Sequence, residues 1–116
     1  AKAAAEVKEE SARVIEAEIR RQLKKPTGEL TKADLEKVTR LNLDNNQLTD
    51  VKGLEKLTQL TKLRLEDNQL TNVKGLEKLT QLKELNLTYN PDLTNAQIDE
   101  LKKALPKCKF YSNAKK

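Results

Sequence analysis

Leucine and polar residues alternate in three short segments along the middle of the chain. The segments LNLDNNQL (41–48), LRLEDNQL (63–70) and LNLTYNPDL (85–93) begin at a constant spacing of 22 residues. Because successive side chains of a strand point to opposite faces, each L-x-L start predicts a short strand with one buried face. The pattern therefore predicts one strand in each of three equivalent repeats.

A repeat of this length with the pattern L-x-L-x-x-N-x-L is typical of a leucine-rich repeat solenoid. The asparagine after each strand is expected to point inward and to satisfy backbone groups left free where the chain bends. Stacking of repeats would then make a structural asparagine ladder of Asn46, Asn68, Asn90 and, in a fourth repeat, Asn113. In the next segment, GLEKLTQL, leucines three residues apart predict a short 3₁₀ turn on the convex side.

A fourth strand is predicted near the end of the chain. Residues 105–113 fit L-x-x-L-x-L-x-x-N, with Cys108 at the first strand leucine and a phenylalanine at the second. The segment before it begins with a capping box, Thr94 with Gln97, and continues with an apolar helical stripe up to Pro106. Cys108 is predicted to be a buried small apolar residue without a redox or nucleophilic role.

The first 38 residues are predicted to cover the apolar end of the solenoid. Apolar residues from Val7 to Leu23 recur at helical spacing and predict an amphipathic helix over about 5–24. After a break at Pro26, Thr31 is the expected N-cap of a second, short helix that leads into the first strand at about Val38. The prediction is an α/β solenoid, a short right-handed superhelix of about four parallel strands with an N-terminal helical cap and one convex helix near the C-terminus. It forms one domain, with the cap at 1–38, the repeats at 39–113 and a tail at 114–116.

The segments NQLTDVKGLEKLTQL and NQLTNVKGLEKLTQL resemble the 22-residue repeats of bacterial internalin-type leucine-rich repeat proteins. Residues 14–38 are similar to the N-terminal helical cap of many bacterial secreted or surface repeat proteins. The resemblance implies a curved sheet whose concave face binds a protein or a glycan, in an extracellular, periplasmic or cell-surface setting; no signal peptide is recognised in the sequence. Sixteen of 22 positions are identical between 41–62 and 63–84, and methionine is absent, which also fits an engineered or structural scaffold without a natural ligand.

The composition argues against catalysis. The chain has no histidine, which removes the usual general base and the commonest metal ligand, and it has no phosphate-binding loop or paired-cysteine motif. Asp44 and Glu66 could face each other on adjacent strands, but an open, solvated face does not raise a carboxyl pKa. We therefore expect no enzymatic activity, no cofactor and no metal site. No apolar stretch approaches 18 residues, so membrane insertion is not expected.

The net charge of +5 comes from 23 basic and 18 acidic residues. The excess lies in residues 101–116, which hold six lysines and no acidic residue except none after Glu100. Nucleic-acid binding usually needs basic groups that follow a groove, often with stacking aromatic residues, and this chain has three aromatic residues in all. The expected partner is a protein, with a glycan as the alternative, and the chain is expected to be a monomer.

The outward side chains of the four strands are the predicted binding surface. Five of the six positions that differ between the first two repeats flank or fall within the strand segment, as expected for a fixed core with a variable display face. By strand alternation, the predicted columns are Arg40, Lys62, Glu84, Lys107; Asn42, Arg64, Asn86, Lys109; and Asp44, Glu66, Thr88, Tyr111. Arg64 and Tyr111 are of types enriched in binding hot spots. The alternative is a solvated face whose charge pairs each contribute little.

Overall fold

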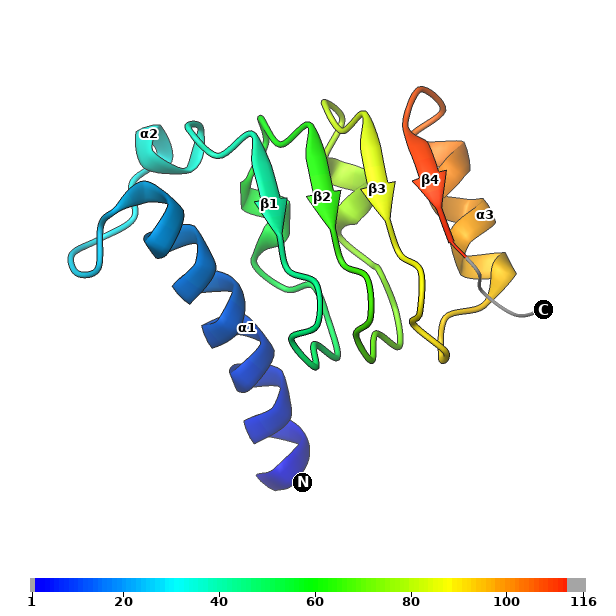
Figure 1. Cartoon of the computed structure of the whole chain (residues 1–116), viewed down its shortest axis with the longest axis horizontal. Coiled ribbons are helices and arrows are strands. Elements are labelled where there is room, and N and C mark those ends of the chain that lie inside the picture. Colours follow the sequence, from blue (N-terminus) through cyan, green and yellow to red (C-terminus); the bar gives the residue numbers. More distant parts are fainter. Residues whose placement is uncertain (1, 113–116) are drawn as a thin grey trace.

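The computed structural model describes residues 2–112, with side chains from Ser11 onward. Four strands form one parallel sheet in the order β1-β2-β3-β4. Two 3₁₀ turns and a helix lie behind the sheet, on its convex side (Figure 1). The predicted short solenoid of parallel strands is confirmed. Its elements are α1 (Lys2–Leu23), α2 (Lys32–Leu35), β1 (Arg40–Asn42), η1 (Leu54–Lys56), β2 (Lys62–Arg64), η2 (Leu76–Lys78), β3 (Glu84–Asn86), α3 (Asn95–Ala104) and β4 (Lys109–Tyr111).

The leucines of the repeats stack in register to form the core. Leu41 pairs with Leu63, and Leu63 pairs with Leu85, so residues 22 apart lie side by side. All three are at most 2 % exposed, and their neighbours along β1 and β2 are exposed. Burial of these apolar side chains is the main favourable contribution to folding. The alternation that predicted the strands is therefore the alternation between core and solvent.

Each convex turn begins at a glycine in the left-handed region. Gly53 has φ 105° and Gly75 has φ 110°, a conformation that residues with a Cβ rarely adopt. The N–H of Gly75 donates to Glu77 Oε1 at 2.7 Å, and Gly53 makes the equivalent bond to Glu55 at 2.8 Å. Hydrogen bonds from the backbone N–H groups of Glu77 and Gly75 lower the pKa of Glu77. These turns are the predicted 3₁₀ segments.

The helix α1 lies beside β1, at the N-terminal end of the sheet (Figure 1). Ile15 and Ile19 are buried in the leucine core. The side chain of Gln22 donates to the Arg40 carbonyl on β1 at 2.7 Å, and Ser11 Oγ accepts from the N–H of Thr49 at 3.1 Å. The helix therefore covers the edge of the first repeat with both apolar and polar contacts. Val7, part of the predicted stripe, lies outside the described side chains.

Both predicted capping boxes are confirmed. Thr31 accepts from the N–H of Asp34 and Thr94 from that of Gln97, and each partner side chain accepts from the N–H of its threonine in return. The helix α3 ends at Ala104, just before the proline that was expected to stop it.

The predicted register of the fourth strand is wrong by two residues. Leu85 pairs with Phe110, so the phenylalanine occupies the place that the sequence assigned to Cys108. The N–H of Cys108 donates to the Leu105 carbonyl at 3.1 Å, which places Cys108 in the turn between α3 and β4. The ten-residue helix replaces a three-residue 3₁₀ turn, and the chain needs extra residues to return from it to the sheet. Cys108 is half-buried against the core rather than fully buried, and this burial, with the nearby charge of Glu84, raises the pKa of its thiol to about 11.

Candidate binding surface

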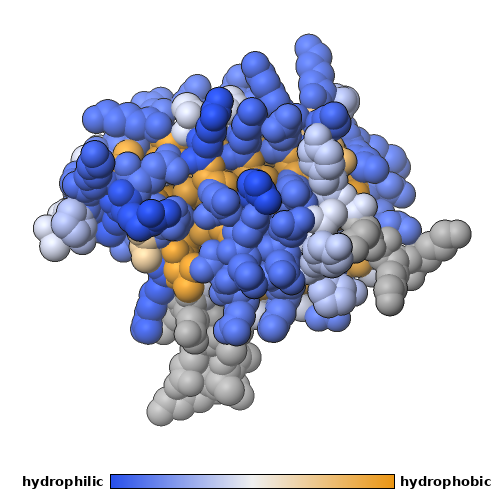
Figure 2. Space-filling view, viewed as in Figure 1, coloured by the Kyte–Doolittle hydropathy of each residue, from blue (hydrophilic) through white to orange (hydrophobic). Residues whose placement is uncertain are grey.

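The outward side chains of the sheet form one hydrophilic face, which becomes less hydrophilic toward β4 (Figure 2). Strands β1 and β2 each expose the two residues that flank a buried leucine. The observed register changes the predicted columns at β4. Lys109 lies opposite Glu84 and Tyr111 opposite Asn86, so Lys107 precedes the strand and is not part of a column. Asn113, the last predicted member of the asparagine ladder, lies outside the described residues.

Arg64 is the centre of a polar network on this face. Its Nη2 lies 2.8 Å from Asp44 Oδ2 and 3.5 Å from Glu66 Oε2. Asp44 Oδ1 accepts from the N–H of Glu66, and Glu66 Oε1 accepts from Thr88 Oγ1, both at 2.9 Å. The two carboxylates considered as a formal catalytic pair thus share one guanidinium. The side chain of Arg64 remains 53 % exposed and is available to a partner on its outer side.

The column at the start of the strands is mainly basic. It runs Arg40, Lys62, Glu84 and Lys109. Lys62 Nζ lies 3.7 Å from Glu84 Oε2, whereas Arg40 forms no ion pair within residues 2–112. Lys109 Nζ lies 5.4 Å from the centre of the Tyr111 ring, and its hydrogen bond with Tyr111 raises the pKa of Lys109. The column therefore presents excess positive charge beside an exposed aromatic ring.

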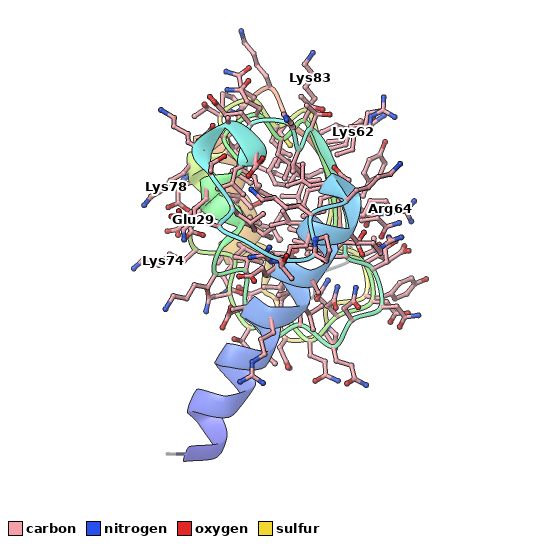
Figure 3. All side chains as sticks on the ribbon, turned by 90° about the vertical axis from the view of Figure 1, so that its left-hand side faces the viewer. Glu29, Lys62, Arg64, Lys74, Lys78 and Lys83 are labelled. Carbon is pink, nitrogen blue, oxygen red and sulfur yellow. The ribbon has the colours of Figure 1, made fainter. Side chains whose placement is uncertain are left out.

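The side chains on the two sides of the solenoid point in opposite directions. Figure 3 shows Lys62 and Arg64 on one side and Lys74 and Lys78 on the other. Lys62 and Lys78 are both exposed, and Lys78 forms no ion pair in the described part of the chain. They provide a matched pair of positions for separating the two faces in an experiment.

The inward asparagines lie beneath the loops that follow the strands. Asn68, 3 % exposed, donates from Nδ2 to the carbonyls of Leu43 and Leu65, both at 3.0 Å, and accepts at Oδ1 from the N–H of Leu48 at 3.0 Å. Asn90 donates in the same way to the carbonyls of Leu65 and Leu87. Each of these amides therefore links its own repeat to the preceding one.

Asn46 differs from its predicted inward position. It is exposed, and its Nδ2 donates to the Asp44 carbonyl at 3.1 Å within its own loop. No repeat precedes β1, so Asn46 has no earlier loop to bridge. The position in the repeat is the same, but the neighbour that would bury it is missing.

A row of exposed loop residues was missed by the sequence analysis. Asn45, Asp67 and Tyr89 occupy equivalent positions 22 residues apart, and all three have positive φ, between 59° and 63°. Tyr89 is 60 % exposed, the largest value among the large apolar residues that the structure describes. The available signal was the tyrosine itself, which stands where the other repeats carry Asn and Asp, residue types that tolerate this conformation.

Two further searches cover the described residues. Within residues 2–112, no three His, Cys, Asp or Glu side chains lie close enough together to hold a metal ion. Over the same range, no helix combines the length and the apolar character needed to cross a membrane.

Comparison with known families decides the identity of the repeats. The family model described as leucine-rich repeats (2 copies) matches residues 36–73 and again residues 58–103. The chain belongs to the leucine-rich repeat family. No curated protein sequence matches this leucine-rich repeat protein.

Solved structures show the same fold. An internalin (inlF) from Listeria monocytogenes matches with a TM-score of 0.74 and 24% sequence identity, over 87% of this chain and 30% of the internalin chain. An internalin C2 (inlC2) from the same organism matches with a TM-score of 0.56 and 21% identity, over 87% of this chain and 55% of that one. The predicted internalin-like fold is confirmed. The leucine-rich repeat protein spans between about a third and about half of the length of these two structures.

Proposed function

We propose that this leucine-rich repeat protein is a non-catalytic protein-interaction module that contacts its partner through the concave face of the sheet. The observation that carries this proposal is the location of the differences between the first two repeats. Three of the six changes, Asn42 to Arg64, Asp44 to Glu66 and Lys62 to Glu84, lie on the concave face. The leucines behind them are identical and buried. A constant core with a changing face is the arrangement of a display surface.

The charges of the face suggest the chemistry of the partner. Arg40, Lys62 and Lys109 outnumber Glu84 in the first column, so a complementary partner surface carries acidic groups there. Tyr111, 41 % exposed, and Arg64 lie beside this column and supply an aromatic and a guanidinium contact. Complementary charges of this kind speed association and orient the partner. We also infer that residues 1–38 serve as the end cap, because α1 shields the edge of β1.

The experiment is selection of a binding protein from a display library, followed by affinity measurements on matched variants. Lys62→Glu and Tyr111→Ala on the concave face are compared with Lys78→Glu on the opposite side. We expect each concave variant to weaken binding by about tenfold or more, which corresponds to about 1.4 kcal/mol, and Lys78→Glu to leave it unchanged. Binding should also weaken with added salt.

Equal effects of Lys62→Glu and Lys78→Glu, or no effect of either concave variant, would place the contact elsewhere. The alternative of a scaffold without a natural ligand predicts that no natural partner binds with sub-micromolar affinity. Finding such a partner would therefore rule out the scaffold.

A further inference from the structure

A shallow groove of about 560 Å³ follows the loops after the strands, away from the concave columns. These loops lie side by side at the lower end of the sheet (Figure 1). The groove has two walls of equivalent residues, Asn45, Asp67 and Tyr89 on one side and Gln47, Gln69 and Pro91 on the other, with Asn68 also lining it. It therefore spans three repeats, and its volume lies within the range of small-ligand sites.

The polar side chains of the groove have unused hydrogen-bonding capacity. Within the described residues, the side chains of Asn45, Gln47, Asp67 and Gln69 form no hydrogen bond, whereas Asn68 has its amide fully engaged below them. Amide groups both donate and accept. The groove thus offers three amides and one carboxylate to a ligand in a row along the solenoid axis.

The backbone of the same loops is already paired. The N–H groups of Asn45 and Asp67 donate to the carbonyls of Glu66 and Thr88, both at 2.9 Å, and that of Gln69 donates to the Leu48 carbonyl at 2.9 Å. An extended peptide that binds by strand addition needs an unpaired row of backbone groups. Side chains therefore have to recognise the ligand, which argues against a peptide bound in that way.

An exposed aromatic ring stands at one end of the groove. Tyr89 has φ 59°, a left-handed conformation that costs an aromatic residue energy, and its 60 % exposure gives little burial in return. Strained residues of this kind cluster at binding sites. With Pro91 beside it in the wall, the tyrosine provides an apolar surface next to the amides.

We propose that this groove binds a neutral oligosaccharide. A sugar ring has an apolar C–H face that suits the tyrosine and hydroxyl groups that both donate and accept, which suits the amides. The single formal charge in the groove, on Asp67, opposes anionic sugars. The site is separate from the concave face and does not depend on the proposed protein-binding function.

The test is titration of the ¹⁵N-labelled full chain with maltotriose, cellotriose and chitotriose, with trigalacturonic acid as the anionic comparison, followed by NMR. At about 10 mM ligand, enough to saturate a site of about 1 mM affinity, at least one neutral trisaccharide should shift the amide signals of residues 45–47, 67–69 and 89–91. Tyr89→Asn, which suits the left-handed backbone, and Gln69→Ala should each weaken binding at least fivefold. Tyr111→Ala, which removes the exposed tyrosine of the concave face, should leave it unchanged.

Three results would overturn the proposal. The first is the absence of saturable shifts at these loops with every neutral sugar. The second is unchanged binding by both the Tyr89 and the Gln69 variants. The third is loss of binding by Tyr111→Ala, which would move the sugar to the concave face. None of them bears on capture of a protein partner, which is measured separately with Lys62→Glu and Lys78→Glu.

Discussion

Replacing Asn68 by alanine should destabilise the protein far more than the same change at Asn46, although the two residues hold the same position in consecutive repeats. Asn68 accepts at Oδ1 from the N–H groups of Asn46 and Leu48, both at 3.0 Å, and donates from Nδ2 to the Leu43 carbonyl at 3.0 Å. Alanine would leave both N–H groups without an acceptor. The Leu65 carbonyl would keep a donor, because Asn90 also reaches it at 2.9 Å.

The magnitude follows from the groups left unpaired. Each buried backbone group without a partner costs about 1–3 kcal/mol, so two N–H groups predict a loss of about 2–6 kcal/mol. A typical domain is stable by only about 5–15 kcal/mol. Asn46 is exposed and makes one hydrogen bond within its own loop, so Asn46→Ala should cost less than about 1 kcal/mol. Asn90→Ala should fall between them, because Asn90 Oδ1 accepts one N–H, from Leu70 at 3.2 Å.

Urea unfolding followed by circular dichroism measures all three variants. The expected order of loss is Asn68 first, Asn90 second and Asn46 last, with an unchanged dependence on urea concentration. Equal losses at Asn46 and Asn68 would mean that the links between repeats do not set stability. A loss below about 1 kcal/mol at Asn68 would mean that water satisfies the freed groups.

Three further predictions test single residues. Tyr89→Asn should raise the free energy of unfolding by about 1 kcal/mol, because asparagine tolerates the left-handed backbone, and a lower urea midpoint would contradict this. The hydrogen bond from Lys25, followed by those from Thr31, lowers the pKa of Asp34 to about 2, so its stabilisation is complete above the ordinary pKa of about 4 and disappears as the pH falls to 2. Asp34→Asn should therefore lower the melting temperature at pH 7 and much less at pH 2, and equal losses at both would refute the assignment. The Cys108 thiol, with a pKa of about 11, should react with iodoacetamide at pH 8 about a hundredfold more slowly than it does in urea, and equal rates would contradict its burial.

The sequence predicted those parts of the fold that depend on neighbouring residues or on the repeat itself. Capping at Thr31 and Thr94 involves a partner three residues away, and the leucine register follows from the constant spacing of 22. The register of β4 was missed because Cys108 and Phe110 both fit a leucine position. Only the length of α3 and the turn after it decide between them.

The environment of the candidate site residues was harder to predict. Asn46 and Asn68 have nearly the same local sequence, but burial depends on whether another repeat lies before them. The link between Arg64 and both Asp44 and Glu66 depends on side-chain directions across two strands. Tyr89 was missed because the pattern of leucines and asparagines says nothing about the exposed loop position between them.

The two ends of the asparagine ladder make the protein extensible. Residues 41–62 form a unit whose two neighbours match it at a register of 22, so a second copy inserted after Thr61 and Lys62 keeps every leucine paired. In the inserted copy, the residue equivalent to Asn46 has a loop before it and can bridge two repeats as Asn68 does. The concave face can therefore lengthen one strand at a time while α1 and α3 keep their places at the ends. Insertion after β3 lacks this freedom, because the return from α3 follows a different spacing.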